Sequence, residues 1–220
     1  MKPVQFFGHP FSSYTQKALI ALYENDIGFT FRMLSPEEPA NGEAFARLWP
    51  IRRFPILVDD GRTIVEATSI IEHLEANYPG PAPLIPEDPR AAVEVRMMDR
   101  VFDNYVMTPQ GSIVFNSIRQ PQDRDAYGEA QWRAMLDTSY AWLDERMAGR
   151  EWAVGKTFSL ADCAAAPSLF YADWTHPIDA KYGNLIAYRQ RLLARPSFAR
   201  AVDGGRPYRH FFPLGAPDRD

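Results

Sequence analysis

Hydrophobic and polar residues follow two different patterns in the two parts of the chain. Over the first 80 residues, short apolar runs alternate with amphipathic stretches, which is typical of an α/β unit. The pattern predicts strands at residues 4–7, 29–33, 55–58 and 63–65, the last two forming a hairpin turned at 59–61. It predicts helices at residues 12–24, 43–48 and 67–77. The expected order is strand, helix, strand, helix, strand, strand, helix.

The pattern becomes entirely helical after Tyr78-Pro79-Gly80-Pro81-Ala82-Pro83, a run of residues that interrupts regular structure. We therefore place an α/β domain at residues 1–79, a linker at 80–89 and an all-helical domain at 90–220. One long helical segment should run from residue 90 to about 119, with a kink at Pro109. Further helices are expected at 127–147, 159–174 and 185–193, with a last turn near Phe198.

Charge and cysteine content narrow the classes of function. The net charge of −4 comes from 28 acidic and 24 basic residues spread along the chain, so nucleic acid is not an expected partner. The first apolar run is too short for a signal peptide and no long uncharged apolar stretch occurs, so neither a membrane span nor export from the cytoplasm is expected. The single cysteine, Cys163, excludes an internal disulfide and a CxxC redox or zinc site, and no metal is expected.

The segment from Gly8 to Lys17 joins the first strand to the first helix and holds the first candidate site. A helix N-terminus offers unpaired N–H groups and a positive dipole end, which stabilise a bound anion such as a thiolate. Ser13 lies three residues before Gln16, the spacing of a capping box, so we expect Ser13 to cap the helix. The hydroxyl of Ser12 would then be free to donate to sulfur. The alternative is that both serines only cap.

A nucleophilic role for Ser12 is the weaker interpretation. A serine nucleophile needs a general base held by a third group. His9 is the only histidine nearby, and no G-x-S-x-G elbow surrounds either serine. A hydrolase built on Ser12 and His9 therefore remains a distant third hypothesis.

Arg53-Phe54-Pro55 and Glu66 form a second candidate site. A proline that opens a strand is often only an edge or turn device. If Pro55 is cis, however, the backbone N–H and C=O of Phe54 turn outward and can pair with a peptide-like ligand. Glu66 stands at the following strand-to-helix turn, where it either accepts a ligand ammonium or is an ordinary acid at a helix start.

Two further patterns are structural. Ser159 and Asp162 have the spacing of a capping box ahead of an apolar helix. Aromatic residues recur at helical spacing in the second half of the chain, and most of them are expected in the core.

These signals, in this order, resemble the glutathione transferase family over nearly the whole chain. Ser12-Ser13-Tyr14 followed by Lys17-Ala18-Leu19-Ile20-Ala21-Leu22 is similar to the S-S-C and R-x-R-I-A-L pattern of the zeta class, and to the corresponding serine of the tau and phi classes. The segment from Trp49 to Pro55 is similar to the family's N-P-x-G-K-V-P, and Phe158 to Asp162 is similar to its F-S-x-A-D. The resemblance implies a thioredoxin-like domain followed by an all-helical domain.

The resemblance also implies a role for each residue of the candidate sites. Ser12 would stabilise the glutathione thiolate, assisted by Ser13. Arg53 would meet the glycyl carboxylate and Phe54 the cysteinyl backbone, with Pro55 cis. The pair Glu66-Ala67 falls where the family usually has Glu/Gln-Ser and would hold the γ-glutamyl end, through the Ala67 backbone N–H and with help from Thr68. The chain departs from the family at Ala67, and also at Tyr14, where zeta enzymes have a cysteine; this second departure argues against maleylacetoacetate isomerase activity.

The expected function is therefore a glutathione transferase that uses glutathione as co-substrate and adds its thiolate to a small hydrophobic electrophile. Phe11, Phe102, Tyr105 and Val106 are candidates for the wall of the electrophile pocket, from their expected proximity. A homodimer is expected from the apolar residues Val93, Met97, Met98 and Val101 of the long helix. The alternative function, which Ala67 favours, is a catalytically weak binding or regulatory protein of the same fold.

Overall fold

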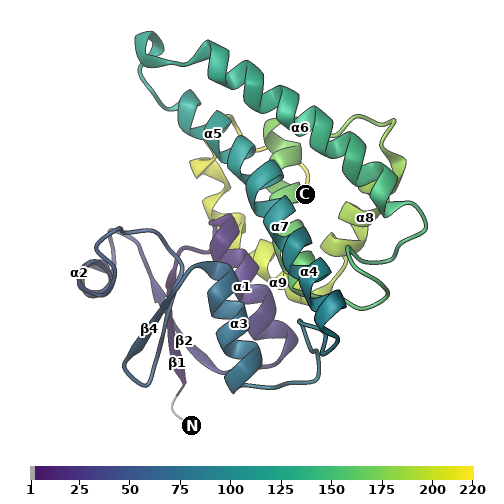
Figure 1. Ribbon diagram of the computed structural model, residues 1–220. Helices are drawn as coiled ribbons and strands as arrows, with labels where there is room; N and C mark the ends of the chain where they lie inside the picture. Colours follow the sequence, from purple (N-terminus) through teal and green to yellow (C-terminus); the bar gives the residue numbers. More distant parts are fainter. Residues whose placement is uncertain (1–2) are drawn as a thin grey trace.

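The computed structural model describes residues 3–220, and its N-terminal part is built on a four-stranded sheet in the order β2-β1-β3-β4 (Figure 1). The strands are β1 (Val4–Gly8), β2 (Phe29–Met33), β3 (Ile56–Asp59) and β4 (Arg62–Val65). The helices of this part are α1 (Ser13–Glu24), α2 (Pro39–Leu48) and α3 (Ala67–Asn77). The predicted order of elements is confirmed, although α2 begins earlier than its pattern indicated, with Pro39 in its first turn.

The rest of the chain is helical. It comprises α4 (Pro89–Val101), the π-helical segment η1 (Phe102–Met107), α5 (Thr108–Ser117), the short η2 (Pro121–Asp123), α6 (Ala126–Met147), α7 (Leu160–Thr175), α8 (Gly183–Leu193), α9 (Pro196–Gly205) and the 3₁₀ segment η3 (Arg206–Phe211). The predicted fold class, an α/β part followed by an all-helical part, is confirmed, whereas η3 was not expected. The domain and linker boundaries at residues 79 and 89 stay predictions. From residue 3 onward, no helix has both the length and the apolar character needed to cross a bilayer.

The long segment from α4 to α5 is interrupted by η1 as well as by Pro109. Proline has no N–H, so the carbonyl of Tyr105 lacks its usual donor four residues later. The hydroxyl of Ser139, on α6, donates to that carbonyl at 2.9 Å. The helix therefore changes geometry one turn before the proline, in the π-helical form that often accompanies a functional site.

Helix α1 is the element that joins the two parts. It contacts α3 on the sheet side and α7 and α9 on the helical side. Its apolar residues Leu19, Ile20 and Leu22 belong to one continuous core cluster with Phe6 of β1 and Leu169 of α7. The two parts thus share a hydrophobic core, and the N-terminus of α1 is fixed relative to both.

Phe102 and Val106 also lie in this core. Both side chains are fully buried, and the Phe102 ring packs 6.4 Å from the ring of Tyr188. The placement of these two residues on an accessible pocket wall is therefore corrected, because they continue the helical spacing of Val95 and Met98 on the face that packs into the core.

Helix α7 begins with the expected capping box. The buried carboxylate of Asp162 accepts from the backbone N–H and hydroxyl of Ser159, at 2.9 and 3.0 Å. It also accepts from the N–H of Ala153 at 2.9 Å and from the hydroxyl of Tyr188 at 2.6 Å. One carboxylate therefore ties the start of α7 to the preceding loop and to α8.

Replacing Asp162 by alanine should lower the free energy of unfolding by about 3 kcal/mol or more, because several buried donors lose their acceptor together. The matched control is Tyr188→Phe, which removes only one of these donors and should cost about 1 kcal/mol. Denaturant unfolding of both variants measures the difference. Equal losses in the two variants would contradict this account of Asp162.

Candidate active site

Strand register brings three loops to one edge of the sheet. Phe7 of β1 pairs with Ile56 of β3, and Ile56 pairs with Val65 of β4. Because β3 is antiparallel to both neighbours, the segment that precedes Ile56 lies beside the segments that follow Phe7 and Val65. The β1–α1 loop, the turn at Pro55 and the start of α3 therefore meet at this edge.

Ser12, rather than Ser13, is the N-cap of α1. Ser12 has extended backbone angles, and its Oγ accepts from the N–H of Thr15 at 3.4 Å. The side chain of Gln16 turns away from the helix start and donates to the carbonyl of Pro10 at 3.0 Å and to the hydroxyl of Tyr171 at 3.2 Å. The predicted capping box of Ser13 and Gln16 is therefore wrong, because a distant tyrosine of α7 engages the glutamine.

Capping does not prevent Ser12 from acting on an anion. A serine hydroxyl has one donor hydrogen and two acceptor lone pairs, so it accepts from Thr15 and still donates elsewhere. The first N–H groups of α1 and its dipole add positive potential at the same place. The Ser12 hydroxyl therefore keeps a hydrogen that it can donate to a bound anion, although it is the cap.

His9 is not placed as a base for Ser12. Its Nδ1 accepts from the backbone N–H of Phe11 at 3.2 Å, which uses the nitrogen that faces the loop. A serine nucleophile needs its base within hydrogen-bond reach. The hydrolase hypothesis therefore gains no support from the structure.

Close packing at Gly8 sets the angle between β1 and α1. A Cβ on Gly8 would lie 2.7 Å from the hydroxyl oxygen of Thr15, a distance that side-chain atoms do not tolerate. Glycine at this position lets the first turn of α1 approach the end of the strand.

The turn before β3 has the features that the family resemblance implied. The Phe54–Pro55 peptide bond is cis, as expected. Phe54 is 38% exposed and packs its ring 6.3 Å from that of Phe45 on α2. Arg53 is exposed beside it, so its guanidinium is available to a ligand carboxylate.

Glu66 is held in an unusual backbone conformation at the start of α3. Its φ is +68°, a region that residues other than glycine seldom adopt and that clusters at ligand sites. Its side chain makes no capping bond and is exposed, whereas Ala67 is buried. Thr68 does not assist as expected, because its hydroxyl bonds the Lys17 ammonium at 2.9 Å and the Asp99 carboxylate at 3.0 Å.

A buried lysine stands behind this edge and links it to the helical part. The ammonium of Lys17 contacts Asp99 at 2.6 Å and Asp103 at 2.7 Å, and its side chain is 1% exposed. Arg100 contacts both carboxylates from the outside and also bonds Thr68. Two cations and two anions thus balance where α1, α3 and the α4–η1 segment meet, in an environment where an unpaired charge is very unfavourable.

Tyr14 lies two residues after Ser12 at the N-terminal end of α1, one helical turn before Lys17. The sequence suggested no role for it. Burial, followed by the negative charge of Asp103, raises the pKa of Tyr14 to about 12. Its hydroxyl therefore stays protonated at neutral pH.

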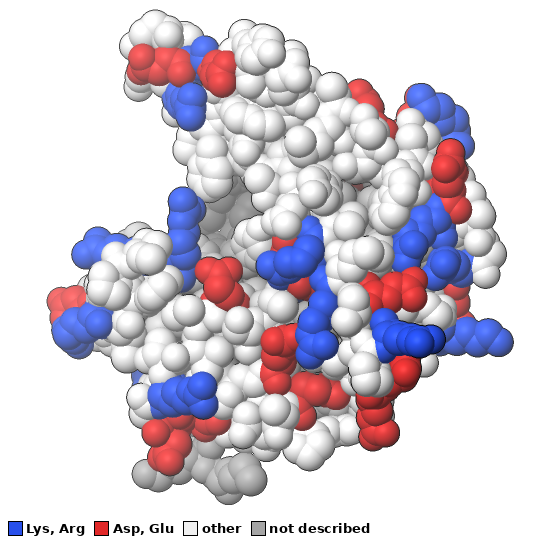
Figure 2. All heavy atoms as spheres, viewed as in Figure 1, with Lys and Arg blue, Asp and Glu red and all other residues white. Residues whose placement is uncertain are grey.

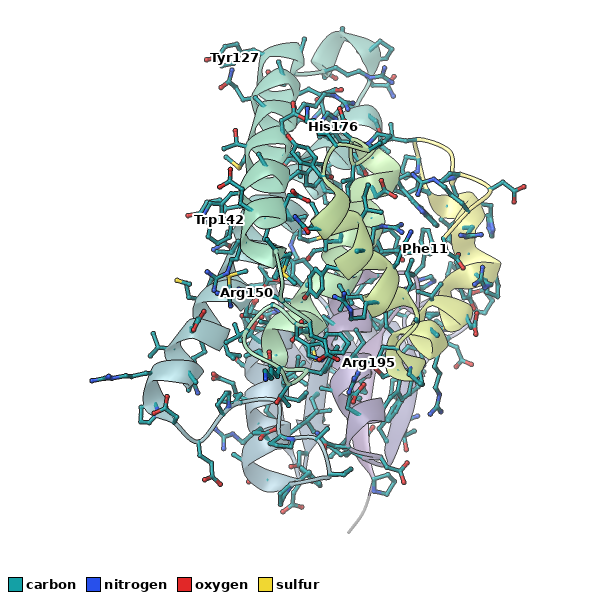
Figure 3. All side chains as sticks on the ribbon, turned by 90° about the vertical axis from the view of Figure 1, so that its right-hand side faces the viewer. Phe11, Tyr127, Trp142, Arg150, His176 and Arg195 are labelled. Atoms are coloured by element: carbon teal, nitrogen blue, oxygen red, sulfur yellow. The ribbon has the colours of Figure 1, made fainter. Side chains whose placement is uncertain are left out.

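Figure 2 shows a hollow on the molecular surface between the α2 side of the sheet part and the upper helices of the helical part. The N-terminal end of α1 points toward it (Figure 1). Phe11 is half-buried between α7 and the C-terminal segment (Figure 3), with its ring 5.5 Å from that of Tyr171. Tyr105, the remaining candidate for the pocket wall, is 51% exposed.

Among residues 3–220, no cluster of His, Cys, Asp and Glu suits a metal ion.

Comparisons with known protein families agree with this geometry. Residues 6–82 match the model of the N-terminal domain of glutathione S-transferases. Residues 120–191 match the model of the C-terminal domain of the same proteins. The two models follow each other in the order in which the sheet part and the helical part occur here.

Three individual proteins show the range of the similarity. A probable maleylacetoacetate isomerase of Vibrio cholerae is 27% identical, over 94% of this chain and 99% of its own. A crystal structure of a glutathione S-transferase of Methylobacterium radiotolerans, in complex with glutathione sulfonate, is 28% identical with a TM-score of 0.79, covering 91% of this chain and 95% of its own. FtsZ-localized protein A of Caulobacter vibrioides is 29% identical, over 70% of this chain and 72% of its own.

Replacing Lys17 by methionine should lower the free energy of unfolding by about 3–5 kcal/mol, since Asp99 and Asp103 would remain buried with only the half-exposed Arg100 to balance their two charges. Arg96→Met is the matched control: Arg96 contacts Glu72 at 2.6 Å in a solvent-exposed pair, and its loss should cost less than about 1 kcal/mol. Denaturant unfolding at neutral pH measures both losses.

The Lys17 effect should also depend on pH. Burial raises the pKa of Asp103, and Lys17 opposes that shift. Without Lys17 the folded-state pKa lies further above the unfolded value, so proton uptake favours the folded variant. The stability gap between the variant and the parent protein should therefore narrow as the pH falls below neutral. A gap that widens toward acid pH would contradict the assignment.

Proposed function

Since the chain belongs to the glutathione transferase family and is a glutathione-dependent enzyme, we propose that it adds the glutathione thiolate to a small hydrophobic electrophile, with Ser12 stabilising the thiolate. The observation that carries this proposal is the position of the Ser12 hydroxyl at the N-terminus of α1, on the same sheet edge as Phe54 and Glu66. A tripeptide can span these loops while its sulfur lies at the helix start.

Each part of glutathione meets a group of suitable chemistry in this arrangement. The exposed guanidinium of Arg53 suits the glycyl carboxylate, and the backbone of Phe54 suits the cysteinyl peptide groups. The exposed carboxylate of Glu66 suits the γ-glutamyl ammonium, and the N–H of Ala67 at the start of α3 suits its carboxylate. Ser13, the first residue of α1, contributes its backbone N–H to the positive end of the helix.

The proposed reaction begins with ionisation of the glutathione thiol and continues with attack of the thiolate on the electrophile. The thiol proton leaves to solvent, and the Ser12 hydroxyl and the helix N-terminus favour the thiolate that remains. A sulfur lone pair forms the new C–S bond, and the electron pair released on the electrophile moves to a leaving group or to a carbonyl oxygen. Because the co-substrate must be in its reduced form, we also propose a cytoplasmic location.

The electrophile is proposed only as a class. Phe11 and Tyr105 are the predicted wall residues that retain exposed surface, and Tyr14 lies two residues after Ser12 at the same helix start. The similarity to a protein named maleylacetoacetate isomerase raises isomerisation by reversible glutathione addition as a related reaction. Tyr14, in place of the zeta-class cysteine, favours transfer over that isomerisation. A panel of electrophiles that includes maleylacetoacetate distinguishes the two.

A second candidate function is a catalytically weak binding or regulatory protein. Ala67 favours it, since no serine hydroxyl is present for the γ-glutamyl end, and the similarity to FtsZ-localized protein A adds a relative named for a location rather than a reaction. Calorimetric titration with glutathione, followed by turnover measurements on the panel, separates the two functions. Glutathione binding without turnover of any electrophile would favour the second candidate.

We further propose that the protein forms a homodimer. Val93 and Met97 of α4 are 65% and 46% exposed, and Trp142 of α6, at the left edge of Figure 3, is 43% exposed. Arg146 connects the two helices, because its guanidinium lies over the Trp142 ring and contacts Glu94 next to Val93. Large apolar residues exposed near one another are typical of an interaction surface. Met98 is fully buried in the core, however, so it does not belong to this surface as expected, and Val101 also packs against the core.

Met97→Glu should convert the dimer to monomers, because a charge would be buried in the apolar interface. Sedimentation at micromolar concentration should give about 50 kDa for the parent protein, twice the 25.1 kDa chain mass, and one chain mass for the variant. Tyr127→Glu, at the far end of α6, is the control and should leave the dimer intact. A monomeric parent protein at that concentration would contradict the proposal.

Ser12→Ala should reduce kcat at neutral pH by about 10- to 100-fold, with the KM for glutathione changed little. A charge-assisted hydrogen bond contributes about 1.5–3 kcal/mol, and its loss reduces the thiolate fraction accordingly. The same change should cost about 1 kcal/mol of stability, since Ser12 is also the N-cap.

Ser13→Ala is the matched control for this experiment. Ser13 is the first residue inside α1 and makes neither the cap bond nor, on this proposal, the bond to sulfur. It should keep kcat within about threefold and leave the melting temperature nearly unchanged. A large loss of kcat in Ser13→Ala, with none in Ser12→Ala, would reverse the assignment of the two serines.

A further inference from the structure

The loop between β1 and α1 is held by hydrogen bonds from several elements. The N–H of Ser12 donates to the carbonyl of His9 at 2.9 Å. The amide of Gln16 donates to the carbonyl of Pro10 at 3.0 Å, and the hydroxyl of Tyr171 donates to the carbonyl of Phe11 at 2.9 Å. The carbonyl groups of these three loop residues are therefore satisfied without the His9 side chain.

The backbone N–H of Phe11, in contrast, has the His9 imidazole as its acceptor. The N–H of Phe11 donates to His9 Nδ1 at 3.2 Å, closing a turn over two residues like the one that Asn side chains form. This bond requires a lone pair on Nδ1, so the ring proton must lie on Nε2. Burial lowers the pKa of His9, which keeps the ring neutral at physiological pH.

The ring is also held in place by η3. Tyr208 packs edge-on against His9 at a centroid distance of 4.7 Å, and Phe211 lies 6.2 Å away. The Tyr208 hydroxyl contacts the Met33 sulfur, at the end of β2, at 3.6 Å. The imidazole is therefore enclosed between its own loop and a segment some 200 residues later in the chain.

Charge pairs keep η3 in this position. Arg206 and Arg209, which flank Tyr208, both contact the side-chain carboxylate of Asp220. The neighbouring Arg219 contacts Asp173 at the end of α7. The ring packing on His9 thus rests on the helical part of the molecule, and it connects that part to the loop that carries Ser12.

We propose that His9 is a positioning residue for Ser12: by accepting the Phe11 N–H, its imidazole fixes the loop so that the Ser12 hydroxyl points at the glutathione sulfur. This inference rests on the proposed function of Ser12. His9 itself touches neither glutathione nor the electrophile. Without the imidazole, the Phe11 N–H loses its acceptor, and the loop before Ser12 is held only through its carbonyl groups and the Phe11 ring. Arg53, Phe54 and Glu66 lie on other loops and keep their positions.

The test compares kcat and KM for glutathione in His9→Ala, His9→Asn, Ser12→Ala and the double variant Ser12→Ala/His9→Ala. His9→Ala should lower kcat about tenfold at neutral pH, which corresponds to the loss of one well-aligned hydrogen bond, with KM within about twofold. His9→Asn should recover kcat to within about threefold, because the Asn carbonyl oxygen accepts from the same N–H. The double variant should be no slower than Ser12→Ala, because the two residues act through one hydroxyl.

The outcomes separate this inference from the proposed function. If Ser12→Ala leaves kcat unchanged, the proposed role of Ser12 fails and this inference fails with it. If Ser12→Ala lowers kcat but His9→Ala does not, only the inference is overturned. Multiplicative losses in the double variant also overturn it, because His9 would then act independently of Ser12. If His9→Ala does not fold, a tenfold loss in the folded His9→Asn variant overturns it as well, since that variant retains the acceptor.

Discussion

The ammonium group of Lys17 occupies the point where α1, α3 and the α4–η1 segment meet, and the position of the active site depends on it. Two carboxylates of the helical part, from Asp99 and Asp103, hold this cation within a nearly dry interior. A buried ion pair adds little net stability, but breaking one is very unfavourable, so it specifies a single arrangement of the elements that it joins. The shared hydrophobic core around α1 supplies the stabilising free energy, and the ion pairs fix the register between the two parts.

With the elements fixed in this way, the N-terminus of α1 presents hydrogen-bond donors to a ligand at the edge of the sheet. The helix brings its unpaired N–H groups and the Ser12 hydroxyl to the sheet edge that also carries Phe54 and Glu66. The site therefore consists largely of backbone groups and one hydroxyl, with no metal or nucleotide in the proposed mechanism. Helix dipoles and fixed donors stabilise an anion without reorganising, which suits a reaction whose main requirement is an ionised sulfur.

Much of this could be predicted from the sequence, because hydrophobic periodicity and turn residues are local signals. The sheet elements, the capping box at Asp162 and the cis bond before Pro55 were all expected and are all present. The predictions that were wrong concern side chains whose partners lie far away in the sequence. Gln16 was expected to form a capping box with Ser13, but its amide donates to the hydroxyl of Tyr171 on α7, and Ser12 is the N-cap.

Other features were not predicted for the same reason. Phe102 and Val106 were expected on a pocket wall, but they continue the helical spacing of Val95 and Met98 on the face that packs into the core. No local pattern indicates the burial of Lys17, because lysine is almost never buried and its partners Asp99 and Asp103 come more than 80 residues later. The role of η3 was likewise invisible, since its contact with His9 joins the two ends of the chain.

In the proposed mechanism, the N-terminus of α1 lowers the pKa of the glutathione thiol. The most direct test is a pH titration of thiolate absorbance near 240 nm for glutathione bound to the unaltered protein, with free glutathione as the reference. The account predicts that the bound thiol has a pKa at least about one to two units below that of the free thiol. A bound thiol that titrates at the same pH as free glutathione, under conditions where calorimetry shows the site to be saturated, would contradict it.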